Sequence, residues 1–184
     1  MLLGIDLGGT KIEGIVIESK RNPNEVIRHR VRTEEDKGYS SVMDNIKLLV
    51  DHIEEKINHK FNRIGIGTPG TVDPKTCLLK NSNSQCLNGM PIQKDLEKIL
   101  KKTVLIQNDA NCFALAETLL GSVKEKYPNV KNVFGIIIGT GVGGGIIIEG
   151  KTVYGSQGIG GEWGHTIVTD NGDECYCGKR GCVE

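Results

Sequence analysis

Three cysteines and one histidine near the end of the sequence form its most specific chemical pattern. Cys175, Cys177 and Cys182 lie close together, and His165 precedes them. One imidazole and three thiolates make a closed tetrahedral zinc site, and with four protein ligands such a zinc is structural. A disulfide within C-x-C is geometrically poor, and the opening residues carry no secretory signal, so paired or free thiols are the weaker alternatives.

Two glycine-rich segments could bring backbone N–H groups close to phosphate oxygens. The first reads DLGGTK over residues 6–11, where Thr10 adds a hydroxyl donor and Asp6 a carboxylate suited to hydrated Mg²⁺. The second reads GTGVGGG over residues 139–145. It is followed by a strand pattern and not by a helix, which argues against a dinucleotide-binding fingerprint. A plain glycine hairpin is the alternative for both segments.

Three carboxylates stand where they could meet a polar substrate. Asp109 follows Asn108 where a strand gives way to a helix, so Asp109 could accept a proton from a substrate hydroxyl while Asn108 orients the substrate. Helix capping is the alternative, because Asn and Asp are favoured N-caps. Glu162 and Glu184 lie beside zinc-ligand candidates and suit sugar hydroxyls, with solvated surface acids as the alternative.

The elements that must position these groups follow from hydrophobic periodicity. Short β-branched runs at 2–7, 12–18 and 25–32 predict an antiparallel meander, and apolar residues at three- and four-residue steps predict a helix over 39–58. A strand at 63–67, a helix at 92–101, a strand at 103–107 and a helix at 109–120 follow. From residue 132 the opening order of strand, glycine turn and strand returns. We expect an α/β protein with a small first domain, 1–120, and an incomplete second domain, 121–184.

Composition bounds the class of protein. The chain has 184 residues, 38% of them hydrophobic, with 23 basic and 23 acidic side chains, which indicates a globular protein and not a disordered one. Its apolar runs are far shorter than the roughly 20 residues of a membrane span, so we expect no membrane partner and a cytoplasmic location. A net charge of zero gives no basic patch, so we expect no nucleic-acid partner.

Six segments occur in a characteristic order: DLGGTK at 6–11, GTPG at 67–70, NDAN at 108–111, GTGVGGG at 139–145, GEWGH at 161–165 and CYCGKRGCVE at 175–184. Across essentially the whole chain this set resembles the ROK family of sugar kinases and sugar-responsive repressors. The resemblance implies an actin-like, ribonuclease-H-like fold in which two related α/β domains close on ATP and a sugar. Family kinases continue well past the last segment, so the fragment alone is expected to be inactive.

The resemblance also implies roles for individual residues. Asp109 is similar to the catalytic base, and Asn108, Glu162, His165 and Glu184 are similar to sugar contacts. His165, Cys175, Cys177 and Cys182 match the zinc ligands. The expected ATP-phosphate contacts are Gly4, Ile5, Asp6, Leu7, Gly8, Gly9, Thr10, Lys11, Gly139, Thr140, Gly141, Val142, Gly143, Gly144, Gly145 and Ile146.

The activity implied by the resemblance is transfer of the γ-phosphate of MgATP to a hexose hydroxyl, most simply the 6-hydroxyl. Within the family, the run KNSNSQCLNG at 80–89 and the segments GEWGH and CYCGKRGCVE favour a fructokinase. N-acetylglucosamine kinase and glucokinase are the alternatives. The full-length protein could form a homodimer. Two other classes stay open, a sugar-sensing repressor and a non-catalytic sugar-binding protein. A repressor needs a DNA-reading module, and the first glycine segment here begins by residue 6.

Overall fold

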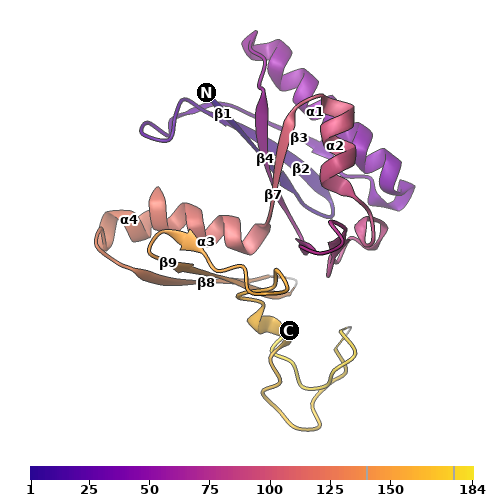
Figure 1. The fold of residues 1–184 in the computed structure, drawn as a ribbon, viewed down its shortest axis with the longest axis vertical. Coiled ribbons are helices and arrows are strands. Elements are labelled where there is room, and N and C mark those ends of the chain that lie inside the picture. The colour runs from indigo at the N-terminus through magenta and orange to yellow at the C-terminus, as the bar shows by residue number, and fades with distance from the viewer. Residues whose placement is uncertain (140, 176) are drawn as a thin grey trace. The chain divides into compact units, whose positions relative to one another are not determined.

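The computed structural model describes residues 1–139, 141–175 and 177–184, which form two compact units, Met1–Asp109 and Ala110–Glu184. The first unit is built on a five-stranded sheet in the order β3-β2-β1-β4-β7 (Figure 1). Its strands are β1 (Leu2–Leu7), β2 (Lys11–Ile17), β3 (Glu25–Arg32), β4 (Arg63–Thr68) and β7 (Thr103–Asn108). The predicted antiparallel meander is confirmed in β1, β2 and β3, whereas β4 pairs in parallel with both β1 and β7.

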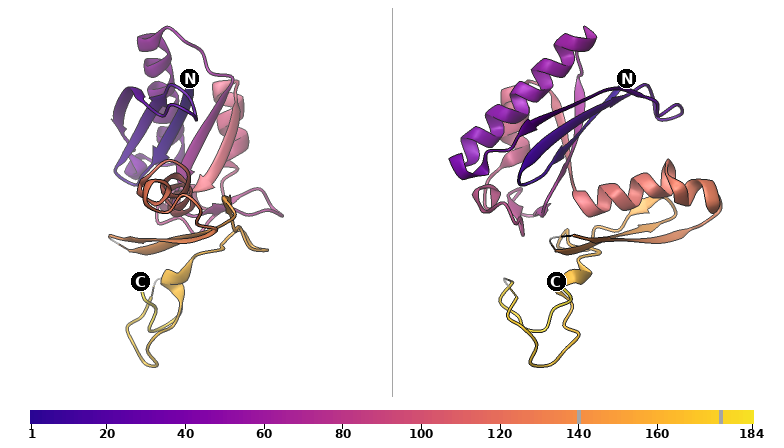
Figure 2. Two further views of the ribbon diagram at one scale, coloured as in Figure 1. Left: turned by 90° about the vertical axis from the view of Figure 1, so that its left-hand side faces the viewer. Right: turned by 180° about the vertical axis from the view of Figure 1, so that it is seen from behind.

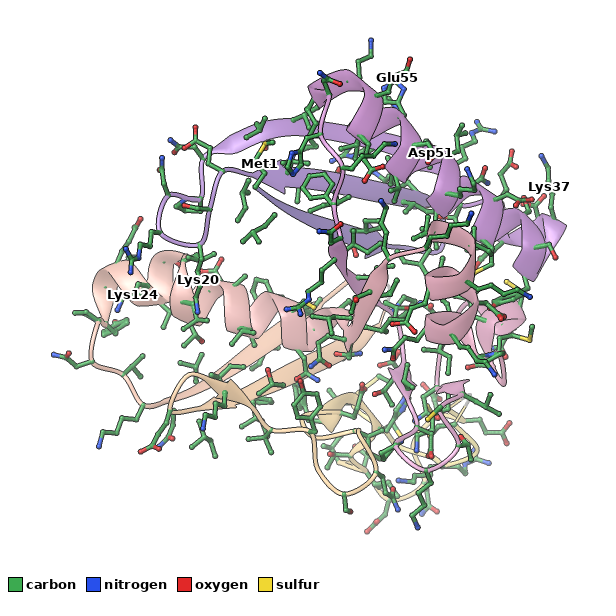
Figure 3. All side chains as sticks on the ribbon, turned by 45° about the horizontal axis from the view of Figure 1, so that its top comes forward. Met1, Lys20, Lys37, Asp51, Glu55 and Lys124 are labelled. Carbon is green, nitrogen blue, oxygen red and sulfur yellow. The ribbon has the colours of Figure 1, made fainter. Side chains whose placement is uncertain are left out.

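Two helices cover this sheet and bury its core. Helix α1 (Tyr39–Ile57) packs on β2 and β3, helix α2 (Ile92–Leu100) packs on β7, and the two helices touch each other. The predicted periodicity of α1 is confirmed, because Ile46, Leu49 and Ile53 are fully buried. Figure 3 shows Asp51 and Glu55 on the opposite, solvent side of α1. Each buried aliphatic side chain contributes about 1.5–3 kcal/mol of stabilisation.

A glycine on β2 allows the close approach of α1. A Cβ added at Gly14 would lie 2.5 Å from Ile53 Cδ1, so a larger residue there would force the Ile53 side chain to move. The remaining elements of this unit are short: η1 (Glu35–Lys37), β5 (Thr71–Val72), β6 (Leu79–Lys80) and η2 (Gln85–Leu87). Strands β5 and β6 form a small antiparallel hairpin that the sequence patterns did not predict.

The second unit combines one long helix with a three-stranded antiparallel sheet. Its helices are α3 (Asp109–Leu119) and α4 (Ser122–Lys126), and its strands are β8 (Asn132–Ile138), β9 (Val142–Ile148) and β10 (Lys151–Thr152), in the order β10-β9-β8. Both views in Figure 2 show β8 and β9 running beneath α3. A Cβ at Gly135 would lie 2.7 Å from Ala114 Cβ, so small residues on both surfaces set this close packing.

The last part of the second unit is mostly irregular. Beyond β10 it contains the short helix η3 (Trp163–His165) and two isolated bridges, Ile167 to Cys182 and Glu174 to Arg180. The predicted domain division at residues 120 and 121 remains a prediction. Among the described residues, no helix has the length and apolar character that crossing a membrane requires.

Candidate functional site

The parallel strands of the first unit bring two predicted segments to one edge of the sheet. Asp6 is in register with Gly67, and Gly67 is in register with Gln107, so the carboxyl ends of β1, β4 and β7 lie side by side. The glycine turn after β1 and the pair Asn108 and Asp109 after β7 therefore share this edge. In open α/β sheets, ligands bind outside the carboxyl ends of the strands.

The first glycine hairpin is held from behind by a residue that sequence reasoning missed. Within the turn, the Gly8 N–H donates to Lys11 O at 3.1 Å. Thr33, which is fully buried, donates its hydroxyl to Gly8 O at 2.6 Å and its N–H to Thr10 O at 3.1 Å. A single threonine after a charged strand has no distinctive signature. Thr33 therefore fixes the turn through both of these hydrogen bonds.

Desolvation raises the pKa of Asp6, the carboxylate at the end of β1. The side chain of Asp6 is exposed, and the desolvation that raises its pKa disfavours the charged form, so a cation beside the carboxylate would be favourable. This fits the prediction that Asp6 holds hydrated Mg²⁺, since carboxylates are ligands of choice for hard cations.

Asn108 and Asp109 differ sharply in their surroundings. Asn108 is 5% exposed, and its amide Nδ2 donates to Gly70 O at 3.1 Å, which ties the end of β7 to the GTPG loop. Gly70 has φ +77°, and a Cβ there would lie 2.3 Å from Lys80 O, so this loop conformation requires glycine. Asp109 is exposed and begins α3, as a group that meets substrate must.

The second glycine segment forms the turn between β8 and β9, with Gly139 N donating to Gly141 O at 2.9 Å. Thr140, a predicted phosphate contact, lies outside the described residues, as does Tyr176. Close packing explains some of the glycines in this segment without a bound phosphate. A Cβ at Gly144 would lie 2.7 Å from Trp163 Cδ1, and one at Gly145 would lie 2.8 Å from Ala110 O. Gly139, in contrast, faces open space.

The predicted zinc ligands come together in the second unit. Among the described residues, His165, Cys175, Cys177 and Cys182 offer ligand atoms that all lie within 4.8 Å of one another. Cys177 Sγ is 3.8 Å from Cys182 Sγ, and Cys175 Sγ is 3.5 Å from His165 Nδ1. Tetrahedral zinc with bonds of about 2.3 Å to sulfur and 2.0 Å to nitrogen requires separations of about 3.8 Å between two sulfurs and about 3.5 Å between sulfur and nitrogen. The four side chains therefore fit the ion.

The thiol electrostatics also indicate a need for a cation. Burial, followed by the neighbouring thiols of Cys177 and Cys175, raises the pKa of Cys182 to about 11. The backbone N–H of Lys179 lowers the pKa of Cys177. Crowding therefore opposes full ionisation of the cluster, and a bound divalent cation would reverse this by stabilising every thiolate.

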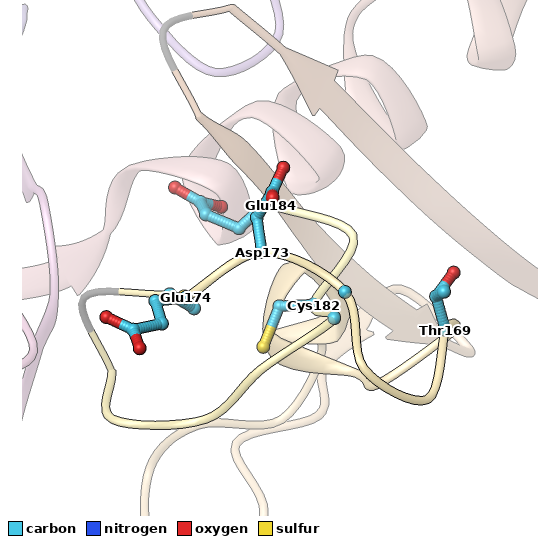
Figure 4. A pocket seen from close by; sticks show the side chains of 8 residues that line it. Thr169, Asp173, Glu174, Cys182 and Glu184 are labelled. Carbon is cyan, nitrogen blue, oxygen red and sulfur yellow. The ribbon is translucent and has the colours of Figure 1, made fainter.

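Two side chains tie the zinc loop, residues 161–184, to the second glycine hairpin. Trp163 Nε1 donates to Gly143 O at 3.1 Å, and the Val142 N–H donates to Glu184 Oε2 at 2.8 Å. Glu184 also borders a cavity of about 340 Å³ together with Asp173, Glu174 and other loop residues (Figure 4). Glu162 directly precedes η3. The structure thus gathers Glu184, the zinc cluster and the second hairpin.

Comparison with known proteins identifies the family to which this arrangement belongs. A model described as the ROK family matches residues 2–184. The chain belongs to the ROK family. This confirms the resemblance drawn from the six segments. N-acetyl-D-glucosamine kinase of Aliivibrio fischeri is 35% identical over 194 aligned residues, which include all of this chain and 61% of the relative. The chain thus spans less than two thirds of such a relative.

Solved structures confirm the actin-like fold of this ROK chain. The ROK hexokinase of Thermus thermophilus superposes with a TM-score of 0.82 at 31% identity, over 98% of this chain and 58% of that one. A ROK glucokinase of Streptomyces griseus, solved with glucose and AMPPNP, gives 0.81 at 31% identity, over 98% and 55%. The roles of individual site residues remain predictions.

Proposed function

We propose that the full-length protein is an ATP-dependent hexose kinase. The observation that carries the proposal is the shared carboxyl edge of the first unit, where a glycine hairpin follows β1 and an exposed aspartate follows β7, on either side of β4. The glycine hairpin suits the phosphate chain of ATP, and the aspartate suits a hydroxyl nucleophile. Kinases need little more than such positioning and charge stabilisation, because the protein forms no covalent intermediate in direct phosphoryl transfer.

In this proposal Asp109 acts as the general base. Its carboxylate takes the proton of the sugar hydroxyl, most simply the 6-hydroxyl, while that oxygen bonds to the γ-phosphorus and the bond to the β-phosphate oxygen breaks, releasing ADP. Asn108, fixed by Gly70, orients the sugar. In each unit, a glycine hairpin would offer backbone N–H groups to phosphate oxygens, and Asp6 would hold hydrated Mg²⁺, which adds positive charge.

Zinc has a structural role in the proposal. His165, Cys175, Cys177 and Cys182 would hold it, and its binding energy would order the loop that carries Glu162 and Glu184. We propose that both glutamates and His165 contact sugar hydroxyls. The separations of Cys177 Sγ from Cys182 Sγ and of Cys175 Sγ from His165 Nδ1 support the zinc assignment, because both match tetrahedral coordination.

The relatives guide the choice of sugar. The Aliivibrio relative is named for N-acetyl-D-glucosamine, and the Streptomyces structure contains glucose. Fructose, which the sequence run 80–89 favoured, finds no support among them. We therefore propose N-acetylglucosamine or glucose as the preferred substrate, these being the two alternatives to fructose.

A coupled assay of ADP release tests the proposal on the full-length protein. MgATP is supplied with N-acetylglucosamine, glucose, mannose or fructose in separate reactions, and a reaction without sugar measures ATP hydrolysis by water. We expect sugar-dependent ADP release, fastest with N-acetylglucosamine or glucose, and about one zinc per chain in the same sample. Sugar binding without turnover on any of the four would instead place the protein among the sensing members of the family.

A further inference from the structure

The carboxylate of Glu184 sits inside the second glycine hairpin. Its Oε2 accepts the Val142 N–H at 2.8 Å, and the Glu184 backbone N–H donates to Gly164 O at 2.9 Å. Val142 is the first residue of β9, so its N–H belongs to the turn that we propose binds phosphate. A group from the zinc loop therefore uses a donor of the phosphate hairpin.

Two glycines make room for this carboxylate. A Cβ at Gly141 would lie 2.2 Å from Glu184 Oε1, and a Cβ at Gly164 would lie 2.9 Å from Oε2. Gly164 has no positive φ, so the local backbone conformation does not require glycine there. Space for the Glu184 side chain accounts for Gly141, and space for both that side chain and Val142 O accounts for Gly164.

We propose that Glu184 is an interlock between the sugar and the nucleotide, a proposal that rests on the proposed kinase function. The Glu184 carboxylate and a phosphate oxygen cannot both accept the single Val142 N–H. Their negative charges also repel each other. Without sugar, Glu184 holds the hairpin in a state that binds phosphate poorly. Glu184 is therefore a positioning residue for the nucleotide as well as a sugar contact.

The sugar releases the interlock by competing for the same side chain. A sugar hydroxyl that donates to Glu184 favours the state in which the carboxylate has left Val142, and this state is the one that admits phosphate. Sugar and nucleotide then strengthen each other's binding by the same factor, as linkage requires. Such coupling would limit ATP hydrolysis when no sugar is present.

Calorimetric titration of the zinc-loaded, full-length protein with Mg-AMPPNP tests the interlock. Without sugar, Glu184→Ala should bind the nucleotide about tenfold more tightly than the wild type, a typical size for coupling between sites. Glu184→Gln should fall between them, because its amide oxygen can still accept the Val142 N–H but carries no charge. Glu174→Ala is the matched control, since it removes the same charge from an exposed position paired with Arg180. It should leave nucleotide affinity unchanged.

The result separates the interlock from two simpler roles of Glu184. A pure sugar contact leaves sugar-free nucleotide affinity unchanged, and a purely structural residue lowers it when replaced; either outcome overturns the interlock while the kinase function stands. If Glu184→Ala loses zinc, the nucleotide affinity of Glu184→Gln decides the question. Tighter binding than in the wild type supports the interlock, and unchanged binding overturns it. A wild type that binds no nucleotide, with or without sugar, overturns the interlock and the kinase function together.

Discussion

At the scale of single residues, the proposed general base is Asp109, and the residue proposed to orient the sugar is Asn108. Asp109 is exposed at the start of α3, whereas Asn108 is buried and bonded to Gly70 O. Capping of α3 is the competing role for this pair, and an Asp to Asn change distinguishes the two. Asn is as good an N-cap as Asp, but it cannot accept a proton as a base.

We therefore expect Asp109→Asn to lower kcat of the full-length protein by at least about 100-fold, with sugar affinity largely kept. Steady-state kinetics and a separate sugar titration measure the two effects. Glu117→Gln, on the same helix, is the control and should retain turnover, because Glu117 accepts hydrogen bonds from Ser122, beyond the other end of α3. Unchanged turnover in Asp109→Asn would assign Asp109 to capping.

A second residue-scale prediction concerns the stacked imidazoles of His29 on β3 and His52 on α1. Their ring centroids are 4.0 Å apart with an interplanar angle of 25°. Burial, then the charges of His52 and Lys56, lowers the pKa of His29. The unfolded chain therefore binds a proton there at higher pH than the folded chain does. His29 thus costs stability as the pH falls through about 6.5, the value for an unfolded histidine, towards its lower folded pKa.

Nuclear magnetic resonance titration of the histidine ring protons checks this prediction. We expect the pKa of His29 to lie below about 6.5 in the wild type and to rise in His52→Gln, because one of the charges that lower it is gone. His59→Gln is the control, since His59 instead contacts Phe61. A pKa of His29 that does not move in His52→Gln would mean that burial and Lys56 lower it without His52.

At the scale of elements, the helices and strands that could be predicted are those with a strong hydrophobic periodicity. The α1 residues Ile46, Leu49 and Ile53 recur at helical steps, so both the helix and its buried face could be predicted before the structure was known. The short β-branched runs around the first glycine turn likewise indicated the antiparallel strands. In these segments the local pattern and the tertiary packing require the same conformation.

The elements that could not be predicted depend on contacts between distant segments. Parallel pairing of β4 with β1 and β7 joins strands far apart in the sequence, and no local pattern specifies their neighbours. The support of the first hairpin by Thr33 also arises only in the fold. The same holds for the contact of Glu184 with Val142, 42 residues away. The ligand residues of the zinc site could be predicted from their types and spacing. The hydrogen bonds that join the zinc loop to the second glycine hairpin could not, because they form only in the fold.

A buried ion pair joins the end of α1 to the strands beside it. Glu54 has a side chain 1% exposed, and its carboxylate accepts from Lys102 at 2.7 Å, from Lys60 at 2.9 Å and from the Phe61 N–H at 2.8 Å. Burial alone would raise the pKa of Glu54, but Lys102, the Phe61 N–H and Lys60 outweigh burial and lower it. Glu54 thus anchors three segments through one carboxylate.

We expect Glu54→Gln to lower the free energy of unfolding by about 3 kcal/mol, because it leaves Lys102, whose side chain is 11% exposed, without its partner charge. Urea denaturation measures the change. Glu55→Gln, on the solvent side of α1, is the matched control and should change stability by less than about 0.5 kcal/mol. Similar losses in both variants would mean that the anchor contributes no more than a surface charge.

At the scale of the whole molecule, the two units draw their stability from different sources. The large hydrophobic core lies entirely in the first unit, running from Leu3 to Val104 among β1, β2, α1, β4, α2 and β7. Residues 161–184 of the second unit contain one short 3₁₀ helix and two isolated bridges. We therefore expect a loop with so little regular structure to depend on the proposed zinc for its order, because the metal's binding energy would become folding energy.

Removal of zinc should therefore act locally. We expect a chelator to speed backbone amide exchange in residues 161–184, and at Val142 through the loss of Glu184, while α1 and β1 keep their protection. Exchange measured by mass spectrometry on the full-length protein, with and without chelator, reports each segment separately. Cys177→Ser should reproduce the chelator's effect without any added reagent, whereas Cys77→Ser, outside the cluster, should not. If α1 lost protection as fast as the zinc loop, the first unit would depend on the metal, and its core alone would not account for its stability.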